Sequence, residues 1–206
     1  MYCGAVPVPG GRIVSPFGMR AAGMHTGIDI AAPAGTPVRT IIPGRVVVVA
    51  PTGQLELYGN TVVVQHDVKL YSLWAHLQEF SVSPHEVVDQ GAELGRVGRT
   101  AGTRAEPWRE FASSSAHLHL EFLSQWPPRG RDLDRLDVGP ILGELGIIVP
   151  ANGPMQSVCQ HVASEAYAVA PSSSSSSSSR GGGLGVALLV GYLLQRMIER
   201  SGVRRG

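Results

Sequence analysis

The sequence has few charged residues. They make up 16% of the 206 residues, and the formal net charge is only +1 at pH 7. Proteins that bind nucleic acid usually show a strong excess of basic residues, because each contacted phosphate is neutralised by a cationic side chain. The overall charge therefore argues against nucleic acid as the main partner.

Cysteine is also scarce. The chain has two, Cys3 and Cys159, and they lie near opposite ends of the sequence without forming a CxxC pair. This arrangement predicts neither a disulfide framework nor a cysteine-based metal site. It leaves open whether the two thiols stay unpaired or form a single long-range bridge.

Two kinds of targeting segment are missing. Met1–Gly10 has neither a basic start nor a continuous apolar stretch, so no signal peptide is predicted. The apolar segment Leu184–Leu194 is short: as a helix, residues 181–195 span about 22 Å, less than the ~30 Å hydrocarbon core. A complete transmembrane helix is not expected. The alternatives are a helix against a partner protein, a membrane contact, or neither; if it inserts, Arg196–Arg205 favours a cytoplasmic C-terminus.

Glycine, proline and β-branched residues are abundant. The chain holds 26 Gly and 15 Pro, and 43% of its residues are hydrophobic. Val46–Val49 follows the turn pair Pro43–Gly44, and Thr61–Gln65 follows Tyr58–Asn60. Short Val-rich runs bounded by Gly, Pro and Asn are typical of antiparallel strands. We therefore predict a mainly β protein with one globular domain.

A histidine and a carboxylate stand four positions apart in His25–Asp29. This spacing places both side chains on one face of either a strand or a helix. Gly27 and the following Ala31–Pro33 disfavour a helix, so the segment is predicted to be extended.

A second cluster, His117–Phe122, alternates strictly between polar and apolar residues. His117, His119 and Glu121 face one side, and the intervening leucines and Phe122 face the other, as expected for a half-buried strand. His76 ends a third segment of strand character. For Glu121, two roles stay open: orienting a histidine from behind, or pointing outward into solvent.

Imidazole and carboxylate groups gathered in this way are suited to zinc. Catalytic zinc takes three protein ligands, with a fourth position for water. Taken singly, each cluster also has a simpler explanation, because isolated histidines on sheets and in turns are common. The other histidines, His66, His85 and His161, lack partners at ligand spacing and are predicted to be structural or exposed.

The order of the motifs carries more information than any one of them. The chain resembles the lysostaphin-type (LytM-like) zinc endopeptidases over about residues 10–122, in motifs that occur in the family's order. These are Ser15–Arg20, His25–Val38, Pro43–Gly44, Tyr58–Val62, Ala75–Leu77, Gly91–Gly102 and His117–Phe122.

The resemblance implies a function and a role for five residues. His25, Asp29 and His119 correspond to the zinc ligands, and His76 and His117 to the residues that assist the water and the transition state. It further implies an antiparallel sheet with a long groove and, as substrate, peptides of bacterial peptidoglycan. The chain departs from the family in having Ser115–Ala116 before the HxH motif and an apparent insertion at Thr103–Ser115, which is expected beside the groove.

The remaining sequence suggests appendages. We predict a zinc peptidase domain at 1–125, an extension packed on it at 126–170, a flexible Ser/Gly linker at 171–183 and an apolar then basic helix at 184–206. The linker and tail suggest a phage virion component that acts at the tail and contacts tail proteins through this helix. The alternatives are a catalytically inactive peptidase-like module and a membrane-tethered bacterial enzyme that remodels the cell wall.

Overall fold

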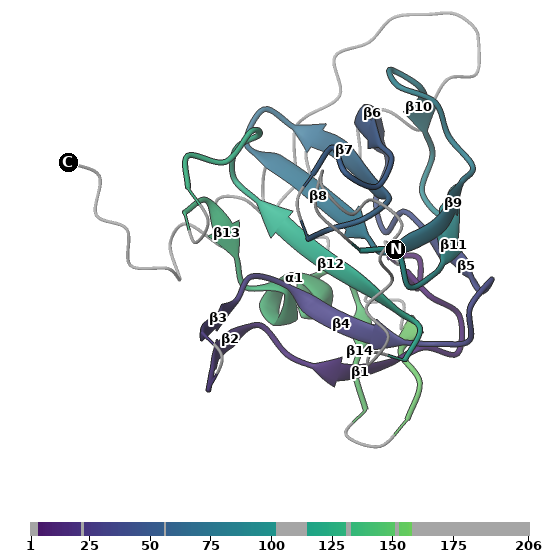
Figure 1. Cartoon of the computed structure of the whole chain (residues 1–206). Helices are drawn as coiled ribbons and strands as arrows, with labels where there is room; N and C mark the ends of the chain where they lie inside the picture. The colour runs from purple at the N-terminus through teal and green to yellow at the C-terminus, as the bar shows by residue number, and fades with distance from the viewer. Residues whose placement is uncertain are drawn as a thin grey trace, which may run out of the picture.

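The computed structural model describes residues 4–21, 23–55, 57–101, 115–130, 133–150 and 153–157 (Figure 1). Several predictions concern residues outside these ranges: Cys3, Cys159, His161, the linker at 171–183, the helix at 184–206 and most of the insertion at 103–115. Among the described residues, no helix has both the length and the apolar character needed to span a membrane.

An eight-stranded sheet forms the body of the described structure, and all its strand pairs are antiparallel. The predicted mainly β, antiparallel fold is confirmed. In spatial order the strands are β1 (Arg12–Ser15), β4 (Ile28–Ala31), β12 (His117–Leu123), β8 (Leu70–Ala75), β7 (Thr61–Asp67), β6 (Gly44–Ala50) and β10 (Val87–Val88), with β13 (Arg135–Leu136) paired to β12.

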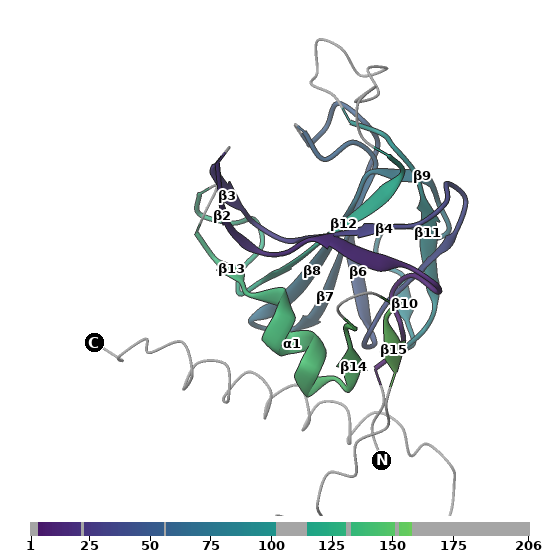
Figure 2. The same ribbon diagram turned by 90° about the horizontal axis from the view of Figure 1, so that it is seen from below.

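Smaller elements surround this sheet (Figure 2). They are the three-stranded sheet β5 (Pro37–Arg39), β11 (Glu93–Val97) and β9 (Leu77–Phe80), the hairpin β2 (Gly18–Arg20) and β3 (Gly23–His25), the pair β14 (Ile147–Ile148) and β15 (Gln156–Ser157), and the helix α1 (Val138–Glu144). The Asp137 side chain caps α1 by accepting a hydrogen bond from Gly139 N. The predicted extension at 126–170 therefore contains a short capped helix.

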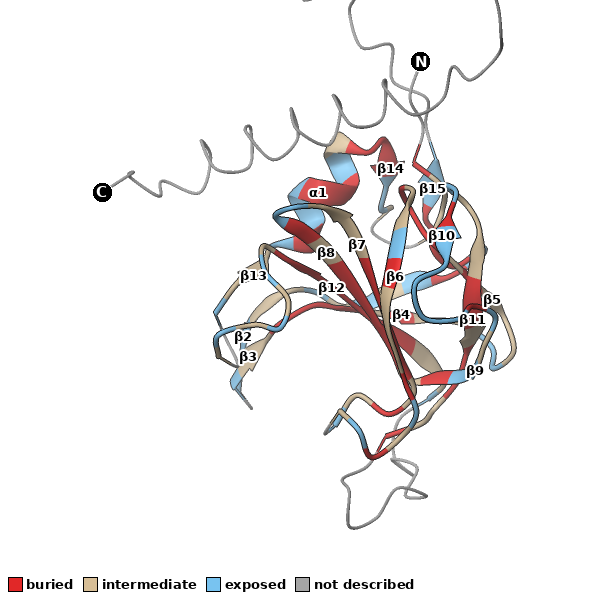
Figure 3. Cartoon of the chain, turned by 90° about the horizontal axis from the view of Figure 1, so that it is seen from above, coloured by how far each residue is buried: buried red, intermediate tan, exposed pale blue. Residues whose placement is uncertain are grey.

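Strand β12 shows how the sheet divides into two faces. Leu118, Leu120 and Phe122 are fully buried in the main core, against α1 on one side of the sheet (Figure 3). The predicted alternation therefore holds, because His119 and Glu121 occupy the opposite face. The core also includes Val138, Ile141 and Leu142 of α1, so the described part of the segment after residue 125 shares one hydrophobic core with the strands before it.

The strand register brings the candidate residues together. Asp29 of β4 pairs with His119 of β12, and Ala75 of β8 pairs with His119 from the other side. His76 directly follows β8 and has a positive φ of 62°. The backbone bends at this point, so the His76 side chain lies beside the same face as His119.

Candidate metal centre

Three atoms from two distant parts of the sequence converge. His25 Nε2 lies 3.2 Å from Asp29 Oδ1 and 3.2 Å from His119 Nδ1, and His119 Nδ1 lies 2.9 Å from Asp29 Oδ1. His25 ends β3, Asp29 is on β4 and His119 is on β12. The structure thus places the three residues predicted as metal ligands around one point.

Hydrogen bonds on the outer side of each ring determine which nitrogen faces this point. His25 Nδ1 donates to the Pro16 carbonyl at 2.7 Å, and His119 Nε2 donates to Glu121 Oε1 at 3.1 Å. A neutral imidazole carries one proton, here on the outer nitrogen, so His25 Nε2 and His119 Nδ1 present lone pairs whenever no second proton is bound to the ring. Two lone pairs and a carboxylate oxygen then face each other.

This arrangement fits a small divalent cation. Zinc ligands at about 2.0–2.1 Å in a tetrahedron lie roughly 3.3 Å from one another. The three atoms are separated by 2.9–3.2 Å, close to the edges of such a tetrahedron. Two histidines and a carboxylate are also a donor set that zinc prefers.

The charges around His119 also favour a cation. Burial lowers the pKa of His119, but its contacts with Asp29 and Glu121 outweigh burial and raise the pKa to about 9. Burial raises the pKa of Asp29, but hydrogen bonds from His119 and His25 hold it well below its usual range. Positive charge is therefore stabilised between His119 and Asp29, and either a proton or a metal ion can supply it.

The two histidines predicted to assist the reaction lie next to this group. His76 Nδ1 donates to the Thr100 carbonyl at 2.7 Å, and His117 Nδ1 donates to the Ser115 carbonyl at 3.0 Å. Their ring centroids are 4.8 Å apart, and His117 Nε2 lies 4.0 Å from Asp29 Oδ1. Burial and the neighbouring imidazoles lower the pKa of His76 to about 4. His76 is therefore neutral at pH 7, with its proton on Nδ1 and a lone pair on Nε2.

Glu121 points inward and not into solvent. Its side chain is 0% exposed, and Oε1 contacts His119 Nε2. It also accepts hydrogen bonds from Thr26, from Tyr58 at 2.8 Å and from Arg135 Nε at 3.0 Å. The interpretation of Glu121 as an outward carboxylate was wrong.

Three partners of Glu121 were missed in the sequence. Thr26 and Tyr58 belong to family motifs, but nothing in those motifs indicated that their hydroxyls reach Glu121. Arg135 lies in Leu133–Leu136, a segment without a recognisable pattern. Only the pairing of β13 with β12 brings its guanidinium to the site.

The other described histidines lie outside this group. His66 Nδ1 donates to the Pro43 carbonyl at 2.9 Å, and its Nε2 lies 2.7 Å from Ser72 Oγ, so its role is structural. His85 is exposed.

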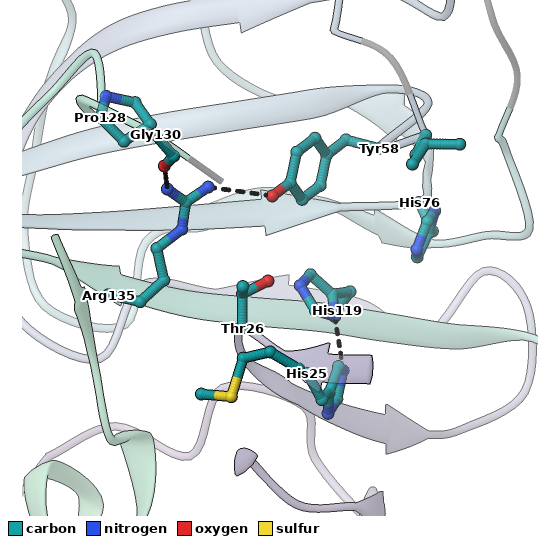
Figure 4. A pocket seen from close by; sticks show the side chains of 10 residues that line it. His25, Thr26, Tyr58, His76, His119, Pro128, Gly130 and Arg135 are labelled. Atoms are coloured by element: carbon teal, nitrogen blue, oxygen red, sulfur yellow. Dashed lines mark hydrogen bonds between the residues drawn. The ribbon is translucent and has the colours of Figure 1, made fainter. Parts of the chain in front are cut away.

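A pocket of about 490 Å³ opens beside the His–Asp–His group (Figure 4). Its walls combine imidazoles with apolar and aromatic side chains. They are formed by Met24, His25, Thr26, Leu57, Tyr58, His76, His119, Pro128, Gly130 and Arg135. A molecule in this pocket would lie within reach of both the convergent group and His76.

Comparison with known proteins identifies the family. The sequence model of Peptidase family M23 matches residues 23–132, more than half of the chain. The chain belongs to this family. The DD-carboxypeptidase/endopeptidase Mpg of Neisseria meningitidis is 39% identical over 117 residues, covering 53% of this chain and 24% of that protein. The peptidoglycan DD-endopeptidase ShyA of Vibrio cholerae is 32% identical over 117 residues, covering 57% of this chain and 24% of that protein.

The fold is also that of a solved antimicrobial peptidase, lysostaphin from Staphylococcus simulans. The TM-score is 0.54 with 21% identity, over 66% of this chain and 50% of that chain. The resemblance read from the motifs is thus confirmed for family and fold. The chain spans about a quarter of the length of Mpg and ShyA.

Proposed function

We propose that this protein is a zinc-dependent endopeptidase that hydrolyses peptide bonds in bacterial peptidoglycan. The observation that carries the proposal is the convergence of His25 Nε2, Asp29 Oδ1 and His119 Nδ1 within 2.9–3.2 Å of one another. Membership of Peptidase family M23 supports peptide hydrolysis. The similarity to ShyA, which is named a peptidoglycan endopeptidase, supports the choice of substrate.

In this proposal, His25, Asp29 and His119 hold one zinc ion. When bound, zinc polarises the scissile carbonyl and lowers the pKa of a coordinated water toward ~7. The Pro16 carbonyl and Glu121 hold the outer nitrogens of His25 and His119, so the inward nitrogens are oriented before the metal arrives.

In this proposal, His76 and His117 accept and donate protons. Each donates its Nδ1 proton to a backbone carbonyl, which leaves Nε2 as the free acceptor on the side of the site. One of them takes the proton of the attacking water, and a protonated imidazole can later deliver it to the leaving amine. The rings lie side by side with centroids 4.8 Å apart, so both reach the same small volume.

The test is a pair of measurements on the purified 206-residue chain. Elemental analysis is expected to find one zinc per chain, and the protein is expected to clear a suspension of purified cell walls. His119→Ala is expected to abolish both, whereas His85→Ala, which changes an exposed residue, should affect neither. Unchanged clearing by the His119 variant would refute the proposal.

A protein that binds zinc and cell walls without clearing them would instead be a peptidase-like binding module, the second function considered. The complete set of five residues at the site argues for turnover. If the protein does clear cell walls, mass spectrometry of fragments released from defined peptidoglycans would show which peptide bond is cut.

We also propose that the enzyme acts from a phage virion, attached at the tail through residues 184–206. The support is the composition of residues 171–206, a Ser/Gly tract followed by apolar and then basic residues. A membrane-tethered bacterial enzyme is the competing setting. Mass spectrometry should detect the chain in purified virions; recovery only from envelope fractions of uninfected cells would favour the competitor.

A further inference from the structure

A buried polar network lies behind His119, on the side of the ring that faces away from Asp29. Its centre is Glu121, whose side chain is 0% exposed. Oε1 contacts His119 Nε2 at 3.1 Å, and Oε2 accepts a hydrogen bond from Arg135 Nε at 3.0 Å. Each carboxylate oxygen is therefore assigned to a different partner.

Every described group in contact with this carboxylate is a donor. Besides His119 and Arg135, the hydroxyls of Thr26 and Tyr58 both donate to Oε1. A buried carboxylate is costly unless it is paired and hydrogen-bonded, and Glu121 is both. With these partners in place the carboxylate plane has little freedom to turn.

Arg135 is itself held in a fixed orientation. Its side chain is 5% exposed, Nη1 donates to the carbonyls of Gly130 and Leu133 at 2.9 and 3.1 Å, and Nη2 donates to Tyr58 Oη at 3.2 Å. Figure 4 shows the guanidinium between Gly130 and the Tyr58 hydroxyl. A planar guanidinium with its donors directed in this way presents Nε to Glu121 in one geometry.

Arg135 reaches the network from outside the family match. The match ends at residue 132, and Arg135 lies on β13, which pairs with β12 through Leu123. The strand that carries His119 and Glu121 is thus flanked by a short strand supplied by the segment after the matched region.

We propose that Arg135 is a positioning residue of the metal centre, acting through Glu121 on His119. It holds Oε2 so that Oε1 stays opposite His119 Nε2, which keeps the proton on that nitrogen and directs Nδ1 toward His25 and Asp29. This inference rests on the proposed zinc site. Groups that orient a metal-binding histidine from behind affect metal affinity although they never touch the metal.

If the network were purely structural, replacing its residues would have a different effect. If Glu121 and Arg135 only stabilise the fold, their replacement lowers the melting temperature but leaves the metal affinity and ligand geometry of the folded protein unchanged. A positioning role changes affinity and geometry at temperatures well below melting.

The test uses two titrations of the metal-free 206-residue chain. Co²⁺ binding is followed by its visible d–d absorption, and Zn²⁺ binding by competition with a chelating dye. Arg135→Gln and Glu121→Gln are expected to weaken metal binding about 10- to 100-fold and to change the shape of the Co²⁺ spectrum. Arg135→Lys keeps the positive charge but loses the planar guanidinium. Compared with Arg135→Gln, it is therefore expected to recover more of the thermal stability than of the metal affinity.

Arg129→Gln is the matched control. Arg129 lies in the same segment, but its side chain is 68% exposed and its guanidinium pairs with Asp134 instead of Glu121. It should leave both affinity and spectrum unchanged. If Arg135→Gln does not fold, Arg135→Lys and Tyr58→Phe provide the test of the positioning role. Tyr58→Phe is expected to weaken metal binding in the same direction, but by a smaller factor.

The outcomes separate the two proposals. Wild-type affinity and spectrum in the folded Arg135 and Glu121 variants would overturn the positioning role while leaving the zinc site intact. Failure of the unmodified protein to bind one Co²⁺ or Zn²⁺ per chain would instead overturn the proposed function.

Discussion

Asp29 and His119 are direct neighbours across the β4–β12 strand pair, and Asp29 Oδ1 lies 2.9 Å from His119 Nδ1. Antiparallel pairing at this register makes the two side chains share one face of the sheet. His25 adds a third atom from β3, four residues before Asp29. The β4–β12 strand pair is therefore the rigid part of the site. Asp29 supplies the negative charge among the three convergent groups.

Replacing that carboxylate should show how much the site depends on negative charge. Asp29→Asn keeps the size and one oxygen but removes the charge, so we expect metal affinity to fall by roughly 100-fold, about 2.7 kcal/mol. Competition with a chelating dye measures this. Asp67→Asn is the control, because Asp67 lies outside the His–Asp–His group and its Oδ1 accepts a local hydrogen bond from Val68 N. Equal affinities in the two variants would contradict a ligand role for Asp29.

The neighbouring histidines should separate metal binding from turnover. His76→Asn and His117→Asn remove proton acceptors that lie beside the three convergent atoms but are not among them. We expect each variant to retain one metal per chain and to lose about 10²- to 10⁴-fold in kcat. Metal content and the rate of release of peptide fragments are the two measurements. Loss of the metal would instead make the residue a ligand.

A substitution at Gly27 tests how closely strands β4 and β12 must approach each other. A Cβ at this position would overlap the Leu120 carbonyl oxygen and lie 2.9 Å from Glu121 Cγ. Gly27→Ala should therefore cost about 1–3 kcal/mol of unfolding free energy and weaken the site. Gly143→Ala in α1 has open space around its Cβ and should stabilise by about 0.5–1 kcal/mol. Urea unfolding compares them; an equally stable Gly27 variant would show that the strands can separate without cost.

The pKa of His66 leads to a prediction of how the stability of the folded protein depends on pH. Burial lowers the pKa of His66 to about 4, from its ordinary value of 6.5. Between these values the unfolded chain binds the proton and the folded chain does not, so acidification favours unfolding. The contribution of neutral His66 to the free energy of unfolding is fully present above pH 6.5. It is lost as the pH falls toward 4, and the loss amounts to up to about 3 kcal/mol.

Urea unfolding of the wild-type and His66→Gln proteins at pH 7 and pH 4.5, both with a chelator, isolates this effect. The wild-type should lose more stability between the two pH values than the variant does. The neutral ring is fully satisfied, since Nδ1 donates to Pro43 and Nε2 accepts from Ser72. Identical losses in both proteins would assign the acid sensitivity to other groups.

Much of the site could be read from local sequence. The alternation in His117–Phe122 determines which side chains of β12 enter the core, because successive residues of a strand face opposite sides. The same period places His119 and Glu121 together on the other face. The spacing of His25 and Asp29 indicates one face for both, and their convergence with His119 agrees with the order of the family motifs.

Other features depended on contacts between segments that are distant in sequence. The inward direction of Glu121 follows from its hydrogen bonds to Tyr58, Thr26 and Arg135, and the last of these arrives on β13. The outer nitrogens of His25 and His76 are held by the carbonyls of Pro16 and Thr100. Strand periodicity determined which residues could share a face, because it is a local property of the chain. Only the tertiary structure decided which donors and acceptors meet there, because their distances depend on strand register and loop paths that no local pattern encodes.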